Sequence, residues 1–244
     1  MTIMIAGDSW GCGEWKFHKG NYYPELLHKG LEQYLVDDGH NVINVSKGGI
    51  SNLDIINRMQ KWAGRYRDVA IDKVFVFQTE FSRDFKHREY ISAYDVDDWN
   101  ISTVDELISI WIERFYHRLS EFAQSKNCKV YLLGGVADTM WFDNMENDYP
   151  GCSIACQSVT SLLISNNSRV SQPVFSWLTS DDELLVSRLK QSTDIAKLLD
   201  QINLGVEREA TLAEHPKLFF PDGRHPNRHG YKILFNFLKE NQFI

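Results

Sequence analysis

The sequence has few cysteines, no excess of positive charge and no long apolar run. Its 244 residues carry a formal net charge of -7, which gives no electrostatic attraction to nucleic acid or to anionic membranes, so neither is an expected partner. The cysteines are too few and too scattered for a disulfide framework or a zinc ribbon. We therefore expect free thiols at all four of them: Cys12, Cys128, Cys152 and Cys156.

The sequence also has no segment typical of a signal peptide or of a membrane span. The apolar run in residues 1–7 lacks a basic start and is too short for a signal peptide, and no later stretch has the length and apolarity of a membrane span. These absences predict a cytoplasmic protein. No tract of proline, glycine or serine and no block of charge divides the chain, which predicts one domain over residues 1–244.

Strand-like and helix-like segments alternate along the chain. Short runs rich in β-branched residues predict strands at 2–6, 41–45, 73–77 and 129–133, with a further short strand at 218–220. Apolar residues at helical spacing predict helices at 23–36, 52–66, 104–123, 182–201 and 226–239. Strands that alternate with helices form parallel sheets covered on both faces. The predicted fold is therefore a three-layer α/β/α sandwich with a flavodoxin-like central parallel sheet of about five strands.

Residues 137–178 interrupt this alternation. We interpret them as an insertion over the carboxyl edge of the sheet, where a substrate lid or rim would lie. The aromatic residues Trp141, Phe142 and Trp177 in this range either stack on a sugar ring or simply pack against the protein.

Polar residues follow the predicted strands at the edge where ligands collect in open parallel sheets. Gly7, Asp8 and Ser9 follow the first strand, residues 46–52 the second and residues 78–81 the third. Near the other end of the chain, Asp222 precedes His225 by three residues. Pro226 disfavours the α region for His225, so this histidine should be extended just before the last helix.

These four segments, in this order, resemble the sequence blocks of the SGNH, or GDSL, hydrolase superfamily. The resemblance is strongest at the two ends of the chain, in Gly-Asp-Ser at 7–9 and in Asp-Gly-Arg-His-Pro-Asn at 222–227 followed by Gly-Tyr at 230–231. It implies the SGNH hydrolase fold and a serine-dependent ester hydrolase that needs no cofactor and no metal. Short acyl esters, such as acetyl groups on a carbohydrate or another small molecule, are the substrates we expect.

The resemblance also implies roles for individual residues. Ser9 is the nucleophile, His225 is the general base that removes its proton, and Asp222 orients His225 and stabilises the imidazolium. The oxyanion hole is expected to consist of the backbone amides of Ser9 and Gly49, with Gly48 as the alternative glycine, and of a side-chain amide from the third block.

The third block departs from the family pattern, because Glu80 stands where an asparagine is usual. An ionised glutamate donates no hydrogen bond and would repel an oxyanion. Either Gln78 supplies the amide while Glu80 pairs with Arg83, or Glu80 stays protonated, or the site is catalytically weak. In the last case the alternative function is a binding module for a glycan or a protein.

Two other functions have less support in the sequence. His225, His229 and Asp222 are spaced closely enough to suggest a metal site, but no Glu or Cys completes a recognisable ligand set, and we expect His229 on a helix surface. Nucleotide binding would require a glycine-rich phosphate loop after the first strand, and none is there.

Overall fold

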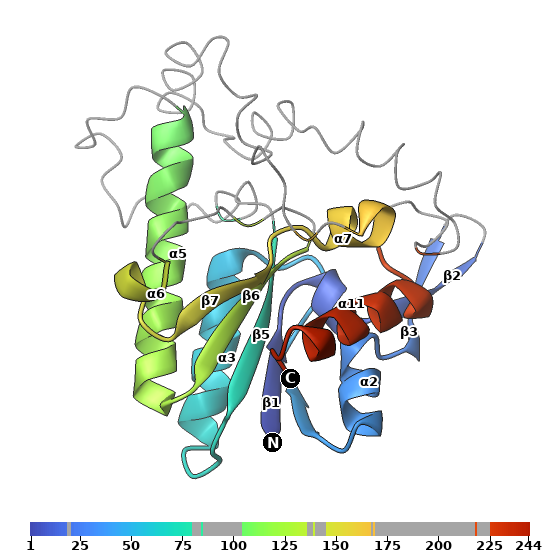
Figure 1. The fold of residues 1–244 in the computed structure, drawn as a ribbon, viewed down its shortest axis with the longest axis horizontal. Helices are drawn as coiled ribbons and strands as arrows, with labels where there is room; N and C mark the ends of the chain where they lie inside the picture. The colour runs from blue at the N-terminus through green and yellow to red at the C-terminus, as the bar shows by residue number, and fades with distance from the viewer. Residues whose placement is uncertain are drawn as a thin grey trace.

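A five-stranded parallel sheet forms the centre of the protein (Figure 1). The computed structural model describes residues 1–18, 21–79, 84, 104–135, 139, 145–166, 168, 218 and 225–244. In chain order the described elements are β1 (Thr2–Ala6), α1 (Ser9–Cys12), β2 (Glu14–His18), β3 (Asn21–His28), α2 (Leu31–Asp37), β4 (Asn41–Asn44), α3 (Asn52–Arg65), β5 (Lys73–Gln78), α5 (Val104–Lys126), β6 (Lys129–Gly134), α6 (Met145–Asp148), β7 (Cys152–Cys156), α7 (Val159–Ser165) and α11 (Arg228–Glu240).

The strands of the sheet follow the order β4-β1-β5-β6-β7, and all neighbouring pairs are parallel. The chain passes from β1 to β4 on one side and then returns to β5 on the other side of β1. The segments that leave the carboxyl ends of β1 and β5 therefore diverge from a switch point, which is where open α/β sheets bind ligands.

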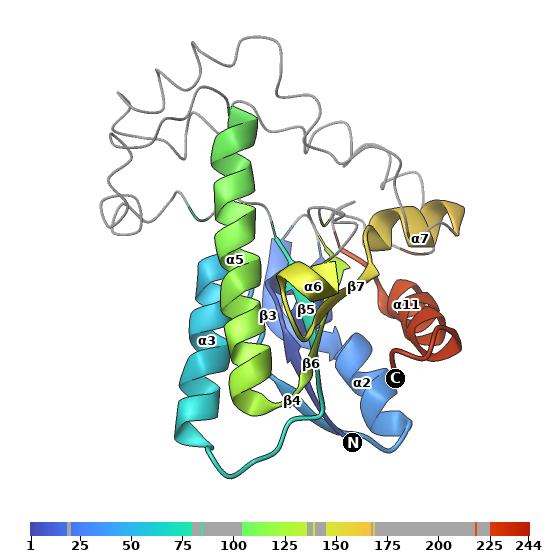
Figure 2. The same cartoon turned by 60° about the vertical axis from the view of Figure 1, so that its left-hand side comes forward.

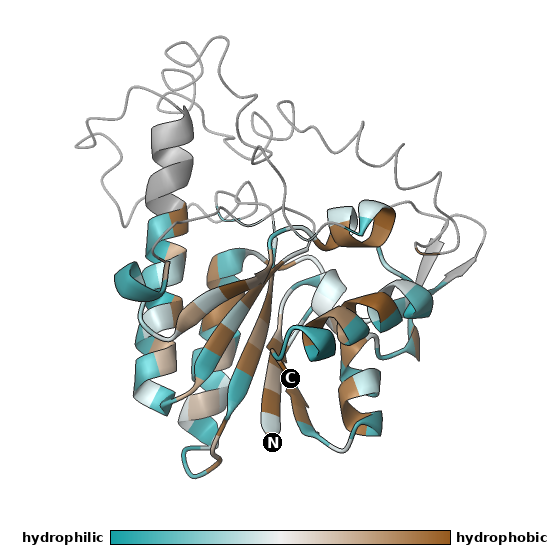
Figure 3. Ribbon diagram, viewed as in Figure 1, coloured by the Kyte–Doolittle hydropathy of each residue, from teal (hydrophilic) through white to brown (hydrophobic). Residues whose placement is uncertain are grey.

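Helices cover both faces of the sheet, as Figure 2 shows. Successive strand residues point to opposite faces, so Met4 and Ala6 of β1 pack with α3 and α5, whereas Ile3 and Ile5 pack with α2, α7 and α11. Figure 3 shows the apolar strands between helices whose outer sides are more polar. Of the helices in the described part of the chain, none is both long and apolar enough to cross a bilayer.

This architecture confirms the predicted fold class, but the first predicted helix is wrong in its first half. Residues 21–28 form β3, which pairs antiparallel with β2 in a separate hairpin, and α2 begins only at Leu31. Leu26 and Leu27 matched a helical period, yet both are exposed. Pairing with a neighbouring strand overrides such local periodicity, because strand stability depends on cross-strand contacts rather than on sequence-local ones.

The interpretation of residues 137–178 as an insertion is wrong for Cys152–Cys156. These residues form β7, the edge strand that pairs with β6, and α7 then packs on the same face as α11. This part of the chain therefore belongs to the sandwich. Trp141, Phe142 and Trp177 lie outside the described residues, as do the predicted helix at 182–201 and most of the predicted strand at 218–220. The single domain over 1–244 stays a prediction.

The four cysteines provide a solution test of this fold. All four are buried and none is in a disulfide, and burial raises the pKa of Cys12 and Cys128 to about 11 and that of Cys152 to about 12. Because the thiolate is the reactive form, we expect native protein to react very slowly with Ellman's reagent at pH 8, and guanidinium-unfolded protein to release four equivalents rapidly. Fast reaction of Cys152 and Cys156 in the native protein would indicate that β7, which holds them, is not part of the sheet.

Candidate active site

Ser9 and His225 lie together although 216 positions separate them in the sequence. The Nε2 atom of His225 is 2.7 Å from the Ser9 Oγ, within hydrogen-bonding distance. Both residues are half-buried, so the pair is packed yet reachable from solvent. This is the geometry in which an imidazole can accept a proton from a serine hydroxyl.

Asp8 shapes the segment that carries Ser9. Its Oδ1 accepts a hydrogen bond from the backbone N–H of Trp10 at 2.9 Å and caps α1, whose first residue is Ser9. Its Oδ2 accepts a second bond, from the Thr79 hydroxyl at 3.0 Å. The side chain is fully buried, so this carboxylate holds the segment after β1 to the residue that follows β5.

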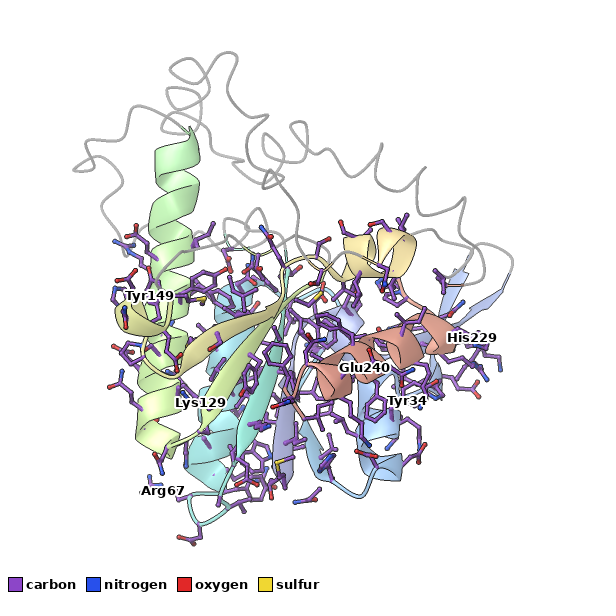
Figure 4. All side chains as sticks on the ribbon, in the orientation of Figure 1. Tyr34, Arg67, Lys129, Tyr149, His229 and Glu240 are labelled. Carbon is purple, nitrogen blue, oxygen red and sulfur yellow. The ribbon has the colours of Figure 1, made fainter. Side chains whose placement is uncertain are left out.

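His225 stands just before α11, as predicted, but the helix starts later than expected. Asn227, not Pro226, is the boundary residue, and its side chain accepts hydrogen bonds from the backbone N–H groups of His229 and Gly230 at 2.9 and 3.1 Å. A side-chain oxygen at this position satisfies amides that have no partner within the helix. His229 is exposed at the outer end of α11, consistent with the expected surface role (Figure 4).

The two glycines after β4 differ in their surroundings. A side-chain carbon on Gly48 would lie 3.9 Å from the Cβ of Ser9 and 3.9 Å from a ring carbon of Trp15. Burial raises the pKa of the Cys12 thiol, and a hydrogen bond from the backbone of Gly48 partly offsets that rise. Gly49 has a φ of +74°, which favours glycine, and the space beside its Cα is open.

Gln78 is the described member of the unusual third block. It ends β5, is fully buried, and its Oε1 accepts a hydrogen bond from the Tyr116 hydroxyl of α5 at 2.8 Å. This bond directs the Gln78 side chain into the layer between the sheet and α5. Glu80, Arg83 and Asp222 lie outside the described residues, so their predicted roles stay predictions.

The comparisons with known proteins agree with this architecture. No protein-family model and no curated protein matches the sequence. Among solved structures, the psychrotrophic esterase EstA from a Pseudoalteromonas species, inhibited by monoethylphosphonate, matches 99% of this chain and 96% of its own with a TM-score of 0.50 and 12% identity. The chain has the SGNH hydrolase fold.

Two further structures match this SGNH fold less closely. TesA has a TM-score of 0.42 and 12% identity, with 98% of this chain and 97% of its own covered. The protein YxiM from Bacillus subtilis has a TM-score of 0.46 and 15% identity, with 99% of this chain but 56% of its own covered.

A hairpin beside the nucleophile adds a residue that the sequence analysis missed. Trp15 lies on β2, is half-buried, and pairs across the hairpin with the exposed Leu26. Its ring lies near Gly48, which in turn adjoins Ser9. The alternation of polar and aromatic residues in Glu14–His18 is typical of a strand, and would have been the signal for this hairpin.

A buried polar network behind the site was also missed. Asn52, the first residue of α3, accepts a hydrogen bond from the backbone N–H of Thr79 at 3.0 Å and donates one to its carbonyl at 2.9 Å. Asn52 also donates to Asp84 at 3.3 Å, and Asp84 accepts from the backbone N–H of Leu53 at 2.9 Å. These bonds join the start of α3 to the segment after β5, in addition to the link through Asp8.

No metal centre accompanies the site in the part of the chain that the structure describes. There, no three His, Cys, Asp or Glu side chains lie close enough to hold an ion. Asp222, one of the three candidate ligands with His225 and His229, lies outside the described residues.

The buried carboxyl of Asp84 gives a testable dependence of stability on pH. Burial raises its pKa to about 6 from an ordinary 3.8, against the lowering by hydrogen bonds from Leu53, Ser51 and Asn52. Between these two values the folded protein binds more protons than the unfolded chain, so this group makes stability fall as pH rises from about 4 to about 6. We expect the free energy of unfolding, measured with urea, to fall over this pH range in the wild type more than in Asp84→Asn. If the two proteins differ in this free energy by the same amount at every pH, the raised pKa of Asp84 is wrong.

Proposed function

We propose that the protein is a serine-dependent ester hydrolase that works through an acyl-serine intermediate. The observation that carries this proposal is the 2.7 Å distance between the Ser9 Oγ and the His225 Nε2. Two features support it. The pair lies at the carboxyl ends of the strands, beside the switch point of the sheet, and the fold is shared with an esterase.

The proposed reaction proceeds in two halves. His225 removes the hydroxyl proton of Ser9 while Oγ attacks the ester carbonyl carbon, and the protonated imidazole then gives that proton to the departing alcohol. In the second half His225 takes a proton from water, whose oxygen attacks the acyl-serine, and returns it to Oγ as the carboxylic acid leaves. Asp222 orients the imidazole in both halves.

The tetrahedral intermediate of each half needs hydrogen-bond donors for its oxyanion. We assign this role to the backbone amides of Ser9 and Gly49, with Gly48 as the alternative glycine because a side-chain carbon there would lie 3.9 Å from the Ser9 Cβ. The third donor is the side-chain amide of Gln78 or a protonated Glu80.

The proposed substrates are short acyl esters, such as acetyl esters, of a carbohydrate or another small molecule. The ring of Trp15, which lies near Gly48 as Ser9 does, supports an alcohol portion with a broad, partly apolar face. An aromatic side chain contributes a large contact area to such a face.

Covalent labelling tests the nucleophile and the base. A fluorophosphonate should modify Ser9 in the wild type, leave Ser9→Ala unlabelled, and label His225→Ala about 10²- to 10⁴-fold more slowly, since general-base assistance is lost. Peptide mass spectrometry after a time course gives both the site and the rate. His229→Ala, which alters an exposed histidine four positions away, is the control and should label at the wild-type rate. Label on another residue, or unchanged labelling of His225→Ala, would contradict the mechanism.

Hydrolysis of p-nitrophenyl acetate distinguishes an enzyme from a binding module. Activity in the wild type that Ser9→Ala abolishes supports the hydrolase. Activity that appears only in Glu80→Asn would instead show that the third block has inactivated the site, and would favour the binding function.

Trp15 provides a test of the substrate class. Trp15→Ala should raise KM for an acetylated monosaccharide by roughly 2- to 10-fold, the equivalent of one lost aromatic contact, while hydrolysis of methyl acetate stays unchanged. Trp15→Phe should retain most of the affinity because it keeps a ring. Equal effects on the sugar ester and on methyl acetate would exclude a contact with the alcohol portion.

A further inference from the structure

We propose that Glu14 and Arg228 form a positioning pair that sets the alignment of His225 with Ser9. The inference rests on the proposed function and adds two residues to it, neither of which touches the reacting atoms. Glu14 follows Ser9 by five positions and Arg228 follows His225 by three, so the ion pair joins the segments that carry the two reacting side chains.

The contact between these residues consists of several hydrogen bonds, and its carboxylate is buried although the Arg228 side chain is 45% exposed. The Oε2 atom of Glu14 accepts hydrogen bonds from the backbone N–H of Arg228 at 2.8 Å and from its Nε at 2.9 Å, while Oε1 accepts from Nη2 at 3.2 Å. Glu14 is 7% exposed. A forked guanidinium on a buried carboxylate restricts orientation as well as distance, which a single surface ion pair does not.

The backbone bond gives the pair control over the start of α11. Arg228 is the first residue of this 13-residue helix, and its amide has no acceptor within the helix. Glu14 supplies that acceptor and places negative charge at the positive end of the helix. Together with the Asn227 cap, Glu14 therefore fixes the start of α11, and His225 lies three positions before Arg228.

A second contact on the same two segments limits rotation about the first. The hydroxyl of Tyr231 donates to the carbonyl of Trp10 at 2.7 Å, and Tyr231 is 1% exposed. Trp10 directly follows Ser9, and Tyr231 lies one helical turn beyond Arg228. Tyr34 of α2 adds a bond from its hydroxyl to the Arg228 carbonyl at 2.9 Å, and Figure 4 shows it beside α11.

Two fixed points are needed because the Ser9 to His225 contact is a single hydrogen bond between half-buried side chains. Displacement of a reacting group by about 1 Å can cost 10²-fold in rate. If the ion pair only stabilised the fold, its loss would lower the melting temperature and leave the turnover of the folded protein intact. If it positions His225, turnover falls while substrate binding persists.

The test compares two conservative variants with a control on the same hairpin. Glu14→Gln keeps an acceptor for the backbone amide but loses the charge, and Arg228→Lys keeps the charge but loses the fork. Both should lower kcat about 10- to 100-fold with KM within about 3-fold of wild type, and should slow fluorophosphonate labelling of Ser9 by a similar factor, all measured well below each melting temperature. The control Glu25→Gln breaks the exposed Lys16–Glu25 pair, 2.8 Å long, and should change neither value.

The double variant Glu14→Gln with Arg228→Gln should lose little more than the more impaired of the two corresponding single variants, because both act through one contact. Unchanged kcat and unchanged labelling in folded Glu14→Gln or Arg228→Lys would overturn the inference, whatever the melting temperature. Should Glu14→Gln fail to fold, Arg228→Lys and Glu14→Asp carry the same test. A wild type that does not label at Ser9 would instead refute the proposed function, so the two failures are distinguishable.

Discussion

Buried carboxylates that accept hydrogen bonds from backbone amides hold the site together. Asp8 accepts from the amide of Trp10 in α1, Asp84 from that of Leu53 in α3, and Glu14 from that of Arg228 in α11. The first amides of a helix have no partner within it, so each carboxylate satisfies a group that would otherwise be left without one. Each carboxylate also joins segments far apart in the chain, and the positions of the three helix starts are thereby coupled.

The sheet makes these contacts possible. Because β1 lies between β4 and β5 and all three run in the same direction, the segments that leave their carboxyl ends begin at one edge. The bond from Thr79 to Asp8 crosses between two of these segments, and Asn52 connects the start of α3 to the same place. The core beneath is packed on both faces, so the edge is a rigid base for Ser9 and His225.

Elements that form because of their local sequence were predicted, whereas elements that depend on pairing with distant segments were not. Buried central strands such as β1 and β6 were predicted to within one residue, because short apolar runs followed by turn residues are typical of buried strands. The hairpin of β2 and β3 was missed, since its helical spacing is a local signal and its pairing is not. The edge strand β7 was missed because Cys152–Cys156 has neither a long apolar run nor strict alternation, and it forms by pairing with β6.

The sequence by itself determined the fold class and which residues to consider as nucleophile and base, because Ser9 and His225 each stand in a short motif with its own local turn chemistry. Only the tertiary structure decided that their side chains meet, that Glu14 accepts from Arg228, that Trp15 lies near Gly48 and that Asp84 is buried. The physical reason is that these contacts join side chains across large separations in the chain. Such pairs leave no periodic pattern and become visible only when the sheet brings their segments to one edge.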